Sequence, residues 1–99
     1  MDFDSRYVMT IDGADAMGEG TIDVINPATG QPFAAAPRAT AADVDAAVAA
    51  ARRALPAWRG LAMAERKAKL VEMGNAIAAN AAELAALFTR EQGRPLAMA

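Results

Sequence analysis

The stretch that decides the fold is residues 25–55, "INPATGQPFAAAPRATAADVDAAVAAARRAL", which passes from a turn through an extended segment into a helix. Asn26-Pro27 and Gly30 predict the turn, because proline presets φ at its own position and glycine supplies a positive φ. Residues 31–39 are expected to run extended, since a residue before proline avoids the helical region. The chain should therefore change from strand and turn to helix near residue 40.

A helix is predicted over residues 40–56. Thr40 is an expected N-cap, and Asp43 three positions later can complete a capping box. Pro56 marks the expected end, because proline lacks the amide hydrogen that a helix interior needs. Apolar side chains recur at helical spacing on one face: Val44, Ala47, Val48, Ala51 and Leu55.

Residues 1–39 are predicted to form short strands joined by turns. The first strand lies in "RYVMTIDG", residues 6–13, which is rich in β-branched and aromatic residues and ends in the turn signal Asp12-Gly13. The second lies in "GTIDVINP", residues 20–27, and ends at Pro27. The front of the chain should therefore be a ribbon of β-hairpins.

Two further helices are predicted, over residues 63–79 and 81–92. Asn80 and Glu83 form a second capping-box pattern, so we expect a break near Asn80 that starts a new helix. The apolar residues of both helices fall on stripes, which we interpret as core. They are Leu70, Met73, Ile77, Leu84, Leu87 and Phe88.

The final residues leave one helix and begin another. Gly93 is typical of a helix end in the left-handed conformation, and Pro95 suits the first position of a new helix over residues 95–99. One helical turn is not stable by itself, and short strands leave edges that need partners. The pattern therefore favours a segment of a larger protein.

Composition excludes several classes of function. A net charge of −2 argues against nucleic acid or a membrane surface as partner. The absence of cysteine and histidine excludes disulfides, thiolate or imidazole metal sites and a histidine general base. No apolar run is long enough to span a membrane, and the N-terminus does not resemble a signal peptide. We expect a soluble, cytoplasmic protein.

Glu91 is the most informative acidic residue. It lies at a predicted helix C-terminus, where the helix dipole disfavours a negative charge. Either Arg94 or a bound cation could compensate it, and a solvated surface carboxylate remains a third interpretation. The rest of the chain carries no paired carboxylates, no phosphate-binding glycine loop and no activated serine.

Two stretches resemble the N-terminal region of the aldehyde dehydrogenase superfamily. One is "INPATGQPFAAAPRATAADVDAAVAAARRALPAWR", residues 25–59, and the other is "AERKAKLVEMGNAIAANAAELAALFTREQGRPLAMA", residues 64–99. They carry the Asn-Pro-x-Thr-Gly turn, a Trp-Arg pair, an Ala-Glu-Arg helix start and a Glu-x-Gly-Lys-Pro helix exit. Here the exit has Arg94 in place of the usual lysine, which keeps the charge but not the shape.

This resemblance implies a fold and an activity. The chain would be the N-terminal part of a Rossmann-like α/β cofactor domain, itself a hairpin ribbon followed by two to three helices. The family oxidises small aldehydes to carboxylic acids with NAD or NADP through a cysteine thiohemiacetal, which suits the nucleophilicity of a thiolate near neutral pH. Its catalytic and cofactor-binding residues lie downstream of this region, so no catalytic or cofactor-binding residue is assigned here. The segment alone should be inactive.

The resemblance also implies a structural monovalent cation. Its ligands would be the backbone carbonyl of Val24 or Ile25 and the carboxylate of Glu91, because oxygen ligands suit a hard cation. A further ligand would come from the remainder of the enzyme chain. The parent enzyme would be a homodimer or homotetramer.

Two other classes of function stay open. The capped helices could form a stand-alone interaction module that dimerises through the Leu70–Phe88 stripe. The chain could also be a nonfunctional truncated product, which should be disordered or aggregate alone. A module should instead show concentration-dependent helicity and one cooperative melt.

Overall fold

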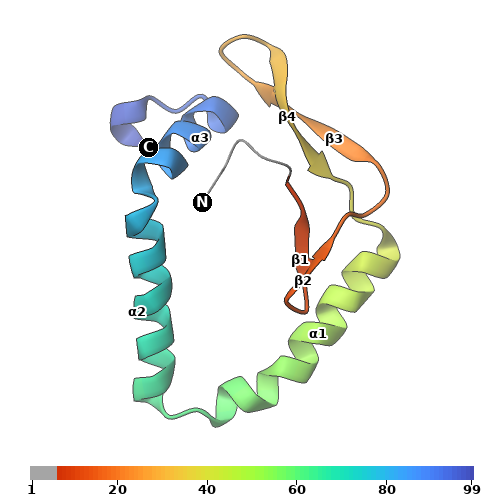
Figure 1. Cartoon of the computed structure of the whole chain (residues 1–99), viewed down its shortest axis with the longest axis vertical. Coiled ribbons are helices and arrows are strands. Elements are labelled where there is room, and N and C mark those ends of the chain that lie inside the picture. The colour runs from red at the N-terminus through yellow and green to blue at the C-terminus, as the bar shows by residue number, and fades with distance from the viewer. Residues whose placement is uncertain (1–6) are drawn as a thin grey trace.

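The computed structural model describes residues 7–99, so residues 1–6 of the predicted strand-and-turn segment lie outside the described residues. Two antiparallel hairpins come first, followed by three α-helices and a short 3₁₀ helix (Figure 1). This order confirms the expected ribbon of hairpins followed by helices. The elements are β1 (Met9–Ile11), β2 (Ala14–Ala16), β3 (Thr21–Asn26), β4 (Gln31–Pro37), α1 (Ala41–Gly60), α2 (Met63–Ala79), α3 (Ala81–Gln92) and η1 (Leu96–Met98).

The first hairpin turns at the predicted Asp12-Gly13 pair. β1 and β2 pair with Met9 opposite Ala16, and Asp12 and Gly13 adopt φ values of 55° and 74°. Positive φ at both central residues gives a turn whose twist matches that of the strands. Arg53 of α1 donates a 3.0 Å hydrogen bond to the Asp12 carboxylate, so an exposed ion pair joins this turn to the first helix.

The second hairpin contains the predicted Asn26-Pro27 turn and an irregularity. The Asn26 side-chain oxygen accepts from the Ala28 N–H at 2.9 Å, and its carbonyl accepts from the Gly30 N–H at 2.8 Å. In the ladder, Val24 stands opposite Ala34 but Ile25 stands opposite Pro32. One residue of β4 is therefore bulged out beside Ile25, which sharpens the local twist of the ribbon.

The start of α1 is as predicted, but its end is not. Thr40 Oγ1 accepts from the Asp43 N–H at 3.1 Å, and the Asp43 carboxylate accepts from the Thr40 N–H at 2.8 Å. These bonds to Thr40 lower the pKa of Asp43 below 3.8. The helix continues past the predicted end at Pro56 to Gly60. Proline removes one backbone hydrogen bond, and this helix tolerates that loss in its last turns.

The break between α2 and α3 falls at Asn80, but the predicted cap is wrong. The side-chain amide of Asn80 donates to the Ala76 carbonyl at 2.8 Å and so closes the end of α2. No side chain caps the first turn of α3, and Asn80 has φ −113° and ψ 16° rather than the extended backbone of an N-cap. The Asn80 amide therefore donates to an otherwise unpaired carbonyl at the end of α2 and does not cap α3.

The segment after α3 forms less helix than predicted. Gly93 ends α3 in the left-handed conformation with φ 73°, as expected. Pro95 has ψ 137° and lies outside the next helix instead of in its first position. Only the 3₁₀ helix η1 follows, because a single turn cannot support α-helical bonding by itself.

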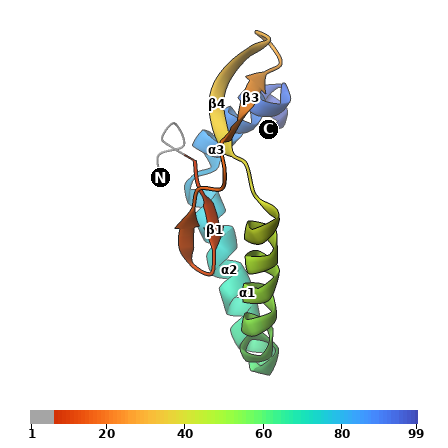
Figure 2. The same ribbon diagram turned by 90° about the vertical axis from the view of Figure 1, so that its right-hand side faces the viewer.

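The apolar stripes interpreted as core are mostly exposed. Among the described residues only Ala50 is buried, whereas Leu70, Met73 and Ile77 are 57%, 58% and 55% exposed. The reason is the arrangement of the helices: α1 and α2 diverge from their junction at Leu61 (Figure 1), and the chain is thin when seen from the side (Figure 2). Contacts with the hairpins are limited: α1 meets β1, α3 meets β3, and Leu84 and Leu87 of α3 are half-buried.

Candidate functional site

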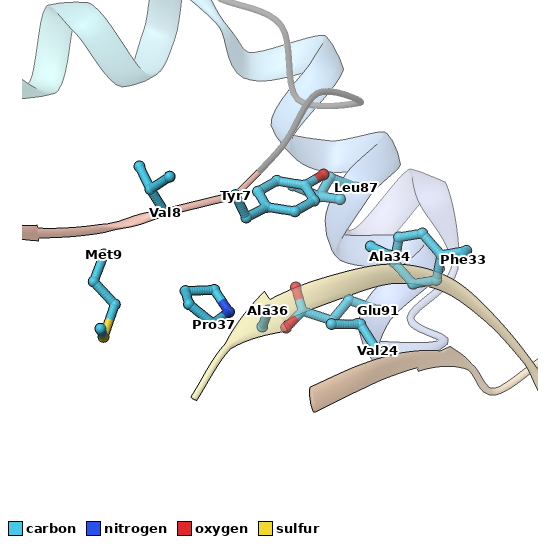
Figure 3. A pocket seen from close by; sticks show the side chains of 10 residues that line it. All are labelled: Tyr7, Val8, Met9, Val24, Phe33, Ala34, Ala36, Pro37, Leu87 and Glu91. Carbon is cyan, nitrogen blue, oxygen red and sulfur yellow. The ribbon is translucent and has the colours of Figure 1, made fainter. Parts of the chain in front are cut away.

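The candidate site is a pocket where the last turns of α3 meet the second hairpin (Figure 3). Its volume is about 400 Å³. The wall is mostly apolar, and Glu91 contributes the one carboxylate among the described lining residues. The lining residues are Tyr7, Val8, Met9, Val24, Phe33, Ala34, Ala36, Pro37, Leu87 and Glu91.

Two contacts fix the end of α3 against the hairpin. The Gly93 N–H donates to the Thr89 carbonyl at 2.8 Å, and a Cβ placed on Gly93 would lie 2.9 Å from Cγ of Pro27. The guanidinium of Arg90 lies 5.3 Å from the centroid of the Phe33 ring, within range of a cation–π attraction. Turn, strand and helix exit are thereby held together around Glu91.

The structure brings two of the three predicted ligand residues together. Val24 of β3 and Glu91 of α3 line the same pocket, and both are drawn there in Figure 3. Ile25 is 44% exposed and is not among the lining residues. The bulge lies between Val24 and Ile25, and Pro32 opposite Ile25 has no N–H to donate. This part of the ladder therefore offers fewer amide donors to the strand carbonyls than a regular pair would.

Glu91 contributes one carboxylate to the pocket, and oxygen is the ligand atom that hard cations prefer. No ion pair between Glu91 and Arg94 is found in residues 7–99, and Arg90 is the basic residue in the last turn of α3. No group of three or more His, Cys, Asp or Glu side chains among these residues could hold a metal.

Comparison with known proteins identifies the family. The family model described as "Aldehyde dehydrogenase family" matches residues 14–99. The chain belongs to the aldehyde dehydrogenase family. The match covers the second hairpin, all three helices and the pocket walls formed by β3, β4 and α3, so the resemblance of the two sequence stretches to this family is confirmed.

Among the curated relatives of this aldehyde dehydrogenase chain, the glutarate-semialdehyde dehydrogenase of Pseudomonas putida is 46% identical, covering 86% of this chain and 18% of the relative. The succinate-semialdehyde dehydrogenase [NADP(+)] of Escherichia coli is 45% identical, with the same coverage. The human methylmalonate-semialdehyde/malonate-semialdehyde dehydrogenase [acylating], mitochondrial, is 42% identical, covering 77% of this chain and 14% of the relative. The chain therefore spans less than a fifth of the length of these three relatives.

Sequence reasoning did not predict the contacts that the Asn-Pro turn and β4 make with the end of α3. Pro27 belongs to the Asn-Pro turn and Gly93 to the helix exit, yet they touch. The Arg90 contact with Phe33 also joins α3 to β4 and has no local sequence signal. In this aldehyde dehydrogenase segment, none of the described helices combines the length and apolar character needed to cross a membrane.

Proposed function

We propose that this chain is the N-terminal segment of an NAD(P)-dependent aldehyde dehydrogenase that oxidises aldehydes to carboxylic acids. The match of residues 14–99 to the family carries the proposal. The reaction would use a cysteine thiohemiacetal, and bound NAD or NADP would accept the hydride. These residues would belong to a Rossmann-like cofactor domain and act as its framework.

The isolated chain is proposed to be inactive. It contains no cysteine to provide a thiolate and no histidine to serve as a base. None of its residues is assigned to catalysis or to binding NAD(P). Its contribution is architectural: the hairpins and α3 place Glu91 beside β3, while α1 and α2 present apolar faces outward.

The substrate proposed for the parent enzyme is a small aldehyde, and the names of the relatives support a semialdehyde. Three relatives are named for glutarate, succinate and methylmalonate or malonate semialdehyde. Each of these compounds carries a carboxyl group besides the aldehyde. The residues that would recognise that group are not assigned within this chain. The parent is proposed to act in the cytoplasm as a homodimer or homotetramer.

We also propose a structural monovalent cation in the parent, held by Glu91 and by the carbonyl of Val24 or Ile25. The shared pocket of Val24 and Glu91 supports this proposal. The cation would offset the charge of Glu91 at the C-terminal end of α3, where the helix dipole is unfavourable. Further oxygen ligands would come from the remainder of the enzyme.

A chimera tests the proposed function. In the Escherichia coli succinate-semialdehyde dehydrogenase, the 85-residue segment aligned with this chain is replaced by the chain itself. We expect the chimera to fold and to reduce NADP⁺ with succinate semialdehyde, because a framework segment of the same family should restore the fold. A chimera that folds without activity, or does not fold, would contradict the proposal.

The isolated chain is the matched control. It should produce no NADH or NADPH with propanal or benzaldehyde, since it has no thiolate. Turnover above a blank, from protein free of host dehydrogenases, would contradict its inactivity.

A second candidate is a stand-alone helical module, and the exposed stripe on α2 favours it. Such a module would dimerise through this stripe, because exposed apolar faces associate. Sedimentation of the isolated chain over a range of concentrations separates the two: a dimer with a single cooperative melt supports the module.

A further inference from the structure

An apolar stripe runs along α2 and contains one arginine. Arg66, Leu70, Met73 and Ile77 recur at helical spacing, so they share one face of the helix. The three apolar side chains are more than half exposed. The stripe continues onto α3 as a hollow of about 400 Å³ lined by Ile77, Leu84 and Phe88, among others. The surface is thus extended and almost uncharged.

Arg66 is unusual within this stripe. Its side chain is half-buried, and its Nε is shielded from water without a hydrogen-bond partner among residues 7–99. A shielded donor without a partner is costly, because folding has removed its water and supplied no acceptor. The guanidinium Nε–H can only donate, so what it lacks is an oxygen acceptor.

We infer that the remainder of the enzyme chain covers the α2 stripe and supplies a carbonyl or carboxylate oxygen to Arg66. This inference rests on the proposed function. The chain spans 18% of the length of the Escherichia coli relative, so most of such an enzyme lies outside it. Apolar side chains of that remainder bury the stripe, and Arg66 is its polar anchor, fixing how α2 sits on the covering surface.

Arg66→Met in the chimera tests the anchor. Methionine keeps the length and apolar stem but donates nothing, so the covering acceptor loses its partner. We expect the apparent melting temperature to fall by more than about 3 °C. Lys67→Met is the matched control, since Lys67 is an exposed neighbour outside the stripe, and it should change the melting temperature by less than about 1 °C. Loss of folding in Arg66→Met alone would be the extreme form of the expected result.

Arg66→Lys separates hydrogen bonding from packing. Lysine keeps a charged donor without the planar fork, so it should recover part of the loss. An unchanged or higher melting temperature for Arg66→Met would overturn the inference, because a purely apolar cover prefers methionine. Equal decreases in melting temperature for Arg66→Met and Arg66→Lys would contradict the proposed oxygen acceptor for Arg66. Both results leave an active chimera and therefore the proposed function intact, whereas an inactive unmodified chimera contradicts that function itself.

A second copy of the chain is the competing occupant. If it covers the stripe, the isolated chain sediments as a dimer that Leu70→Glu dissociates. That result would overturn the inference by assigning the stripe to contacts between copies.

Discussion

Gly93 and Pro27 touch, although one ends α3 and the other lies in the turn between β3 and β4. A Cβ on Gly93 would stand 2.9 Å from Cγ of Pro27, closer than side-chain carbons approach in proteins. The backbone of the helix exit therefore lies directly on the proline ring. This contact lies two residues after Glu91 and joins the helix exit to the turn of the second hairpin.

Gly93→Ala should destabilise the chimera more than Gly30→Ala. Both glycines have φ near 70°, so each substitution carries the strain of about 1 kcal/mol or more for a left-handed alanine. Only Gly93 is also in contact with Pro27, whereas a Cβ at Gly30 meets nothing within 4 Å. We expect about 1 kcal/mol more loss at Gly93. Denaturant midpoints measure both, and equal losses would show that the contact carries no constraint.

Thr40→Ala should cost more than Asn80→Ala. The Thr40 hydroxyl accepts from the Asp43 N–H and donates to the Asp43 carboxylate, so its loss should lower the free energy of unfolding by about 1 kcal/mol. Asn80 caps no helix N-terminus, and its bond to the Ala76 carbonyl is exposed. Alanine is also the better helix former, so Asn80→Ala should change stability by less than about 0.5 kcal/mol. A larger loss at Asn80, measured from denaturant midpoints of the chimera, would restore the capping hypothesis.

The capping box should also respond to acid. Bonds to the Thr40 backbone and hydroxyl lower the pKa of Asp43 below 3.8. A lowered carboxyl pKa stabilises the fold fully above the unfolded pKa, and this contribution is lost as pH falls through the lowered folded value. Helix content of the isolated chain should therefore fall below pH 3.8 with a component that Asp43→Asn removes. The control is Asp45→Asn, on an exposed neighbour, which should leave that component in place; its loss in both variants would contradict the assignment to Asp43.

Local features of the fold could be predicted from sequence because a few neighbouring residues determine them. The Asp12-Gly13 turn, the Thr40 cap and the left-handed Gly93 all follow from backbone preferences within a few positions. Asn80 shows the limit of such reasoning. The break was predictable, but an asparagine side chain can hydrogen-bond to either helix end. In the structure the Asn80 amide bonds to the end of α2.

Features that depend on distant residues could not be predicted. Periodicity marked Leu70 and Met73 as apolar-face residues, but it could not reveal that residues 7–99 leave more than half of each side chain exposed. Likewise, Val24 and Glu91 entered the candidate site through family resemblance. Their shared pocket depends on the packing of α3 on β3, which no local pattern encodes.

Glu91 should make the stability of the chimera depend on the kind of monovalent cation present. Under the cation proposal, K⁺ or Na⁺ binds only the folded state and raises the apparent melting temperature by mass action. A bulky organic cation at the same ionic strength cannot enter the site and should give no increase. Glu91→Gln should blunt the response, because a neutral amide attracts the ion less than a carboxylate does.

The control is Glu83→Gln, at an exposed acidic residue of the same helix, which should leave the response unchanged. If Glu91 is only a surface carboxylate, its removal changes stability by about 0–1 kcal/mol. Melting would then be equal in both salts, which would leave Glu91 with no role beyond the helix exit.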